Sequence, residues 1–185
     1  MSLKYKLGDL IAAANSGEVN VIAHGCNCFT TMGSGIAPLV KAAFPEAWKA
    51  DLQTSKGDKS KLGSYSVGGT SSGLLVYNLY SQYGYSGRNK GIRDLDYNAL
   101  YDSLTAMKKN LTVRGLGSEG FRVGLPKIGA GLAGGDWNVI EAMIMSVFES
   151  YDVTIYVLKS DEIPRKAFKD PELWLDHALW PLEVM

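Results

Sequence analysis

Residues 19–37 read VNVIAHGCNCFTTMGSGIA, and the rest of the chain is organised around them. The first part of this stretch, from Val19 to Ala23, is apolar with little polar alternation, which is typical of a strand buried on both faces. A loop carrying Gly33 and Gly35 follows, and a helix-like segment begins directly after it. This succession brings backbone N–H groups and the positive end of a helix dipole together, so it predicts a phosphate-binding loop. The alternative is an ordinary turn between a strand and a helix.

A cluster of polar side chains lies at the predicted end of this strand, where ligands of open α/β sheets usually bind. It comprises His24, Cys26, Asn27 and Cys28. An imidazole at His24 could protonate a leaving oxygen or orient water, although a buried histidine bonded to a backbone carbonyl is the alternative. The two cysteines are at the limit of disulfide geometry, so we expect free thiols.

Zinc binding by His24, Cys26 and Cys28 is an alternative interpretation of the same cluster. Three ligands from one short strand would crowd a tetrahedral ion, so we predict no metal site and no cofactor.

The composition is that of a soluble globular protein of one domain. Of the 185 residues 46% are hydrophobic and 21% are charged. The 19 basic and 19 acidic side chains cancel, which argues against nucleic acid or an anionic membrane as a partner. Neither a signal-peptide pattern nor a membrane-spanning apolar run is present, so we expect a cytoplasmic location.

The rest of the chain alternates strand and helix patterns. We expect strands at residues 4–6, 63–67, 74–80, 121–125 and 153–158, and helices at 10–15, 36–44, 46–54, 94–111 and from 136 onward. Residues 81–93 form a long loop, a length that is usually functional. We place one domain at residues 1–160 and an extension packing on it at 161–185, with Trp174 and Trp180 as a lid or a dimer contact.

A second glycine-rich loop, KIGAGLAGG at residues 127–135, also follows a strand and precedes a helix. Two such loops could hold a pyrophosphate from opposite sides without a metal ion. Neither loop has the Gly-Lys-Ser/Thr ending of a P-loop or the GxGxxG pattern of a dinucleotide-binding fold, which disfavours a kinase or a nicotinamide dehydrogenase.

Four motifs in this order resemble the macro-domain family: GDL at residues 8–10, HGCNC with GSGIA, LPKIGAGLAGGDW, and VTIYVL. The resemblance implies a three-layer α/β/α fold with a mixed, mostly parallel central sheet and ADP-ribose as the ligand. Within the family, HGCNC, MGSGIA and FPEA are most similar to the branch containing the yeast-type ADP-ribose 1''-phosphate phosphatase and the human terminal ADP-ribose protein glycohydrolase.

The resemblance also implies roles for single residues. Asp9 would accept a hydrogen bond from the adenine amino group, and the Leu10 amide would meet the ring. Asn27 would face the distal ribose. The two phosphate loops would consist of Gly33, Ser34, Gly35 and Ile36, and of Gly129, Ala130, Gly131 and Leu132. Asp9 has a structural alternative as a turn former.

The phosphatase branch has a histidine in the same HxCNC context and uses it near the distal ribose phosphate, so the resemblance implies a catalytic His24. We assign catalysis to His24, Asn27 and Asp136. An aspartate at position 136 could act as a base toward water, and it could equally cap the helix that follows. The two roles are compatible.

Two departures from the glycohydrolase pattern favour the phosphatase. Where that enzyme has an essential lysine this chain has Gln82 or Tyr83, and where it has an acid this chain has Ala133. Lys90 could replace the lysine only if its loop folds over the site. We therefore predict hydrolysis of ADP-ribose 1''-phosphate, with a non-catalytic ADP-ribose reader and an ADP-ribosyl ester deacylase as alternatives. The expected partners are small ADP-ribose derivatives, with ADP-ribosylated protein left open.

Overall fold

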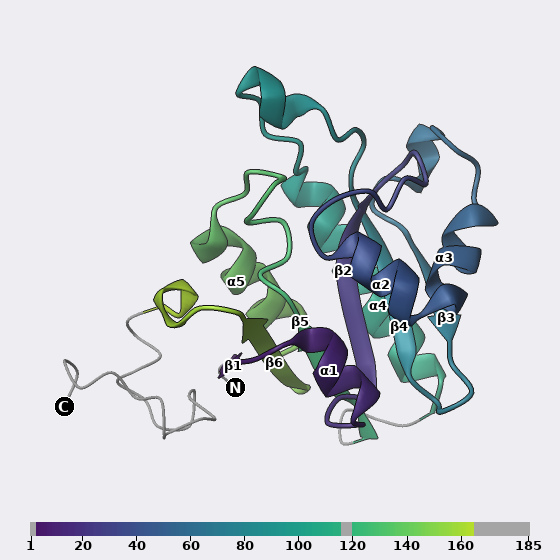
Figure 1. Ribbon diagram of the computed structural model, residues 1–185, viewed down its shortest axis with the longest axis vertical. Helices are drawn as coiled ribbons and strands as arrows, with labels where there is room; N and C mark the ends of the chain where they lie inside the picture. Colours follow the sequence, from purple (N-terminus) through teal and green to yellow (C-terminus); the bar gives the residue numbers. More distant parts are fainter. Residues whose placement is uncertain (1–2, 116–119, 165–185) are drawn as a thin grey trace.

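The computed structural model describes residues 3–115 and 120–164. Its centre is a six-stranded sheet in the order β1-β6-β5-β2-β4-β3 (Figure 1). The strands are β1 (Lys4–Leu7), β2 (Val21–Asn27), β3 (Tyr65–Gly69), β4 (Leu75–Gln82), β5 (Arg122–Leu125) and β6 (Asp152–Val157). All neighbours pair in parallel except β3 and β4, which form an antiparallel hairpin at one edge. The predicted mixed, mostly parallel sheet is confirmed.

Helices cover both faces of the sheet, which gives three layers (Figure 1). The helices α1 (Leu10–Asn15), α2 (Ala37–Ala43) and α3 (Pro45–Leu52) pack on one face. The other face carries α4 (Tyr97–Val113) and α5 (Trp137–Val147). Short 3₁₀ turns lie at η1 (Lys59–Lys61), η2 (Gly87–Lys90) and η4 (Ser160–Glu162).

Two apolar clusters hold these layers together. The larger one joins the sheet to α4 and α5 and includes Leu100, Leu104, Met107 and Ile140, all fully buried. The helical spacing of Leu100, Leu104 and Met107 places these three on one face of α4. The smaller cluster joins α1, α2 and α3 to the opposite face of the sheet.

Because most strands of the sheet are parallel, the loops that follow them lie close together. The carboxyl ends of β1, β2, β4, β5 and β6 all lie at one edge of the sheet, so the loops that follow them meet there. At the top of Figure 1 the segment with η2 projects beyond this edge.

Most predicted boundaries differ from the observed ones by one to three residues, and two of the differences bear on the site. Strand β2 continues through His24 and Cys26 to Asn27, because its pairing with β4 extends that far. Helix α4 begins at Tyr97 and is capped by Asp96, since the Asp94 carboxylate instead accepts from the backbone N–H of Gly87. Within the described ranges no helix has the length and apolarity needed to cross a bilayer. The predicted tryptophan lid, Trp174 and Trp180, lies outside the described residues.

Candidate ligand-binding site

A groove with two lobes crosses the edge of the sheet where the loops meet. The large lobe has a volume of about 510 Å³ and is lined by the first loop, by the ends of β2 and β4, and by residues of the 81–93 loop. The small lobe, about 380 Å³, is lined by the β1–α1 junction, by β6 and by the second loop. Both lobes share Gly35, Ile36, Pro126, Lys127 and Gly131 in their walls, so they meet between the two glycine loops.

The first loop is held in a strained conformation beside the large lobe. Thr30 and Met32 have positive φ values of 52° and 38°, which L-residues rarely adopt. Asn27 fixes the start of the loop: its Oδ1 accepts from the Phe29 amide at 2.8 Å and its Nδ2 donates to Thr31 Oγ1 at 2.8 Å. The second N–H of that amide nitrogen is available to a ligand. Strain of this kind is typical of binding and catalytic loops.

Both glycine loops present backbone donors at the junction of the lobes. Within the described residues, no hydrogen bond is donated by the backbone N–H groups of Gly33, Ser34, Gly35 and Ile36, or by those of Gly129, Gly131 and Leu132. Unpaired N–H groups concentrated on two facing loops favour an anion between them. These unpaired N–H groups support the phosphate-binding prediction more strongly than helix α2 does, because α2 is only seven residues long.

The second loop depends on its glycines. A Cβ at position 135 would overlap Leu95 Cδ2 and lie 2.8 Å from the Gly129 carbonyl oxygen. Gly129 has a φ of 73° and lies close to the same leucine. Gly131 differs, because it lines both lobes and a Cβ there would meet no atom within 4 Å. The glycines at 129 and 135 therefore shape the loop, and the one at 131 leaves room for a ligand.

Asp9 lies in the wall of the small lobe at the start of α1. Its Oδ1 accepts from the backbone N–H groups of Ile11 and Ala12, at 2.6 and 3.1 Å, so Asp9 is the N-cap of the helix. Because both bonds end on Oδ1, the other carboxylate oxygen is available to a ligand. Leu10, Tyr156 and Leu158 complete an apolar wall next to it.

Charged side chains are buried at the floor of the large lobe. Asp51 is 1% exposed; its Oδ1 accepts from the Tyr80 hydroxyl at 2.8 Å and lies 3.8 Å from Lys61 Nζ. Burial raises the pKa of Asp51, against the opposing effects of Tyr80 and Lys61. Burial also raises the pKa of Cys26, which lines the same floor, well above its usual range. The Cys26 thiol therefore stays protonated and is a poor nucleophile.

One side chain in this floor lacks a partner. Ser81 is 1% exposed, and among the described residues its Oγ makes no hydrogen bond. The oxygen lies about 3.0 Å from where a Cβ would stand at Gly25, so the absence of a side chain at Gly25 leaves space beside it. A buried hydroxyl without a partner is costly, and a hydroxyl or water in the lobe would satisfy it.

His24 is not among the residues that line the groove. It is 1% exposed, and its Nε2 lies 2.8 Å from Asn78 Oδ1. The Asn78 amide nitrogen donates to the Ala47 carbonyl and to Ser66 Oγ, so its Oδ1 is the acceptor and His24 Nε2 is the protonated nitrogen. Burial lowers the pKa of His24 to about 4. The structure thus supports the alternative of a buried histidine, with an amide oxygen in place of the backbone carbonyl.

Asp136 is also absent from the walls of both lobes. It is the N-cap of α5, accepting from the Asn138 amide at 2.9 Å, and its own N–H donates to the Tyr97 hydroxyl. Of the three residues assigned to catalysis, Asn27 alone lines the groove. All the residues assigned to ligand binding line one lobe or both.

Several residues of the site carry no motif and were missed from the sequence. Asp51, Ser81, Arg88, Asn89 and Asp94 line the large lobe. The length and glycine content of the 81–93 loop were the signal for Arg88 and Asn89, whereas Asp51 had none. Gln82 and Ala133 both line the large lobe, and Lys90 lines neither lobe.

The cysteines are free, as predicted, and both are buried. Among the described residues there is no group of three His, Cys, Asp or Glu side chains arranged to hold a metal ion.

Curated relatives match most of the chain. An uncharacterised 17.5 kDa protein of the tk–vs intergenic region of phage T4 is 36% identical over 162 residues, covering 84% of this chain and 96% of that protein. An ADP-ribose 1''-phosphate phosphatase of the yeast Debaryomyces hansenii is 29% identical, covering 84% and 99%. The human ADP-ribose glycohydrolase OARD1 is 29% identical, covering 84% and 91%. No model of a protein family matches the sequence.

Solved structures share the fold. A Bacteroides thetaiotaomicron protein of unknown function superposes with a TM-score of 0.70 at 27% identity, covering 84% of this chain and 98% of that one. The macrodomain of Mycobacterium tuberculosis DarG gives 0.64 at 22% identity, covering 83% and 96%. Thermosipho africanus DarTG in complex with ADP-ribose gives 0.63 at 17% identity, covering 94% of this chain and 46% of that one.

The three-layer architecture and these structural likenesses show that the chain has the fold of the macro-domain class. Within that class, the chain belongs to the family of the phage T4 protein, with which it shares more than a third of the aligned residues.

Proposed function

We propose that this chain binds ADP-ribose derivatives along the groove, with the adenosine end in the small lobe and the distal ribose in the large lobe. The observation that carries the proposal is the meeting of the two lobes between two loops with unpaired N–H groups. ADP-ribose has the matching form, since two nucleoside-like ends flank a pyrophosphate. The donors of both loops would bind the pyrophosphate oxygens.

The remaining contacts follow from this orientation. The free carboxylate oxygen of Asp9 would accept from the adenine amino group, while the apolar wall at Leu10 and Leu158 would contact the ring. Asn27 would contact the hydroxyls of the distal ribose. The Ser81 hydroxyl would gain a partner at the floor of the large lobe.

We further propose that the reaction is the hydrolysis of ADP-ribose 1''-phosphate. Water attacks phosphorus, the bond from phosphorus to O1'' breaks, and a proton from water passes to O1'', which yields ADP-ribose and phosphate. The phosphatase of the yeast and the human glycohydrolase are equally similar to this chain, at 29% identity. The support for the phosphatase comes from Gln82 and Ala133, which lie in the large lobe where the glycohydrolase pattern has a lysine and an acid. The proposal assigns Asn27 to the distal ribose and gives no step to His24 or Asp136, because neither lines the groove.

The test is phosphate release from ADP-ribose 1''-phosphate by the full chain, with ADP-ribosylated protein as a second substrate. Asn27→Ala should lower phosphate release strongly, and Lys90→Gln, on a residue outside both lobes, should leave it unchanged. Release of ADP-ribose from the modified protein without phosphate release would contradict the phosphatase. ADP-ribose binding, measured in parallel, reports on the ligand independently of turnover.

A non-catalytic reader is the second candidate. The observation that favours it is the position of His24 and Asp136 outside both lobes, since the groove then lacks both predicted acid–base groups. Tight ADP-ribose binding with no turnover of either substrate would support the reader.

A further inference from the structure

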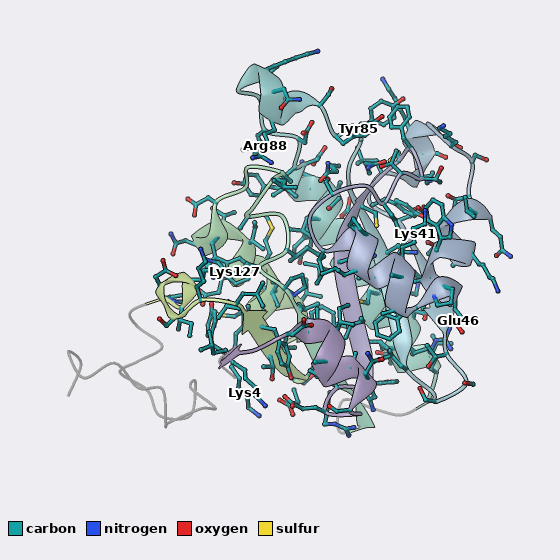
Figure 2. The ribbon with its side chains drawn as sticks, in the orientation of Figure 1. Lys4, Lys41, Glu46, Tyr85, Arg88 and Lys127 are labelled. Atoms are coloured by element: carbon teal, nitrogen blue, oxygen red, sulfur yellow. The ribbon has the colours of Figure 1, made fainter. Side chains whose placement is uncertain are left out.

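A third cavity continues the large lobe outward. It has a volume of about 580 Å³ and is lined by Arg88, by residues 91–93, and by Gly131, Leu132 and Gly134 of the second loop. Arg88, Gly131 and Leu132 belong to the walls of the large lobe as well, so this outer cavity opens from it. In Figure 2 Arg88 lies beneath the η2 turn, on the side toward the second loop.

The Arg88 side chain is not used by the fold. Among the described residues its guanidinium makes no hydrogen bond, ion pair or ring contact. Arg93, the other cation of the outer cavity, is anchored: its Nε donates to the Leu95 carbonyl at 2.9 Å and its Cζ lies 4.4 Å from the centre of the Tyr97 ring. An unpaired guanidinium in a cavity wall is suited to a planar, two-point contact with an anion.

The charges around the large lobe place an anion at its mouth rather than at its floor. The floor holds the carboxylate of Asp51, and Asp94 lies in the wall with both oxygens accepting from the Gly87 amide. The outer cavity has no acidic residue in its lining and has Arg88 and Arg93. The Asp51 carboxylate is already paired with Lys61, 3.8 Å away, whereas Arg88 is not paired within the described residues. A negatively charged group on the distal ribose would therefore be attracted most strongly to the Arg88 guanidinium.

We propose that Arg88 binds a phosphoryl group carried on C1'' of the distal ribose, at the boundary of the large lobe and the outer cavity. This inference rests on the proposed function, because it requires ADP-ribose in the groove. It makes Arg88 the residue that selects the 1''-phosphate over the free 1''-hydroxyl.

The experiment compares two ligands by isothermal titration calorimetry with the full chain. The first is ADP-ribose, and the second is the 1''-phosphonate analogue, in which a CH₂ group replaces the bridging oxygen so that it cannot be hydrolysed as a phosphate ester. The wild-type chain should bind the analogue about 10-fold or more tightly than ADP-ribose, as expected for a charge-assisted hydrogen bond. Arg88→Gln should reduce this ratio to about 1, and Arg88→Lys should restore part of it.

Lys90→Gln is the matched control, because Lys90 lies on the same turn but lines none of the three cavities. Its ratio should stay at the wild-type value. Equal losses in the two glutamine variants would mean a diffuse charge effect and would overturn the assignment, as would an unchanged ratio in Arg88→Gln or a ratio near 1 in the wild type. Failure of the wild type to bind ADP-ribose at all would instead overturn the proposed function.

Discussion

His24 Nε2 donates a hydrogen bond to Asn78 Oδ1 across 2.8 Å, and this bond ties β2 to β4 beneath α3. Through the Asn78 amide nitrogen the same network reaches the Ala47 carbonyl in α3 and Ser66 Oγ in β3. The neutral form of His24 therefore contributes to the packing of α3 on the sheet.

The free energy of unfolding should depend on pH because of His24. Its pKa is about 4 in the folded chain and about 6.5 when unfolded. Because the unfolded state binds the proton more readily, stability is complete above pH 6.5 and falls as the pH is lowered toward 4. The full loss is about 3 kcal/mol. Urea denaturation of wild type and His24→Gln between pH 7 and 4 measures it as the difference between the two profiles; parallel profiles would contradict the assignment.

Substitutions at two glycines of the second loop should affect different properties, one the stability of the fold and the other ADP-ribose binding. Gly135→Ala should destabilise the fold by about 2 kcal/mol, because the new methyl group overlaps Leu95 and crowds the Gly129 carbonyl. Gly131→Ala should leave stability unchanged and weaken ADP-ribose binding by at least about tenfold, or 1.4 kcal/mol, since Gly131 lines both lobes. Urea denaturation and calorimetry together distinguish the two. The reverse pattern, with Gly131→Ala unstable and binding intact, would contradict this placement of the ligand.

Asp9 should have two separable roles. Asp9→Ala removes the N-cap of α1 and should cost about 1 kcal/mol of stability. Asp9→Asn keeps the capping oxygen, so stability should be nearly unchanged, while an amide facing the adenine amino group should weaken ADP-ribose binding. If Asp9→Asn bound ADP-ribose as tightly as the wild type, Asp9 would be a helix cap only.

Ser81→Ala should not destabilise the chain. Removing a buried hydroxyl that has no partner leaves stability unchanged or raises it by up to about 1 kcal/mol, in contrast to the usual cost of a buried Ser→Ala change. If the hydroxyl contacts the distal ribose, the same variant lowers ADP-ribose affinity. Denaturation and calorimetry on one preparation measure both effects. A marked loss of stability would show that Ser81 has a structural partner after all.

The fold was predictable from local patterns. The apolar run before the first glycine loop, the hairpin spacing around residues 68–73 and the helical spacing of Leu100, Leu104 and Met107 each identified the element that the structure contains. The glycine loops could be placed at one edge because parallel strands end together. The boundaries were less certain: nothing local to the sequence reveals that Asp94 closes a loop on Gly87 and leaves the cap of α4 to Asp96.

Residues of the candidate site that belong to a sequence motif could be predicted. Residues that reach the groove through the packing of the elements could not. All the loop residues assigned to the ligand line the groove. His24 was assigned to catalysis because it lies near the first glycine loop and because the phosphatase branch has a histidine in the same context. In the structure β2 continues to Asn27, and the His24 side chain is buried against Asn78. Asp51 and Ser81 reach the large lobe only through the packing of α3 and β4, which no short-range pattern encodes.

Calorimetric titration of the full chain with ADP-ribose, ADP and ribose 5-phosphate shows whether one ligand occupies both lobes. If the two lobes and the loops between them bind one ligand, ADP-ribose should bind at a single site. ADP, which leaves the large lobe empty, and ribose 5-phosphate, which leaves the small lobe empty, should each bind at least about tenfold more weakly. Equal affinity for ADP and ADP-ribose, or no binding of ADP-ribose, would contradict the account.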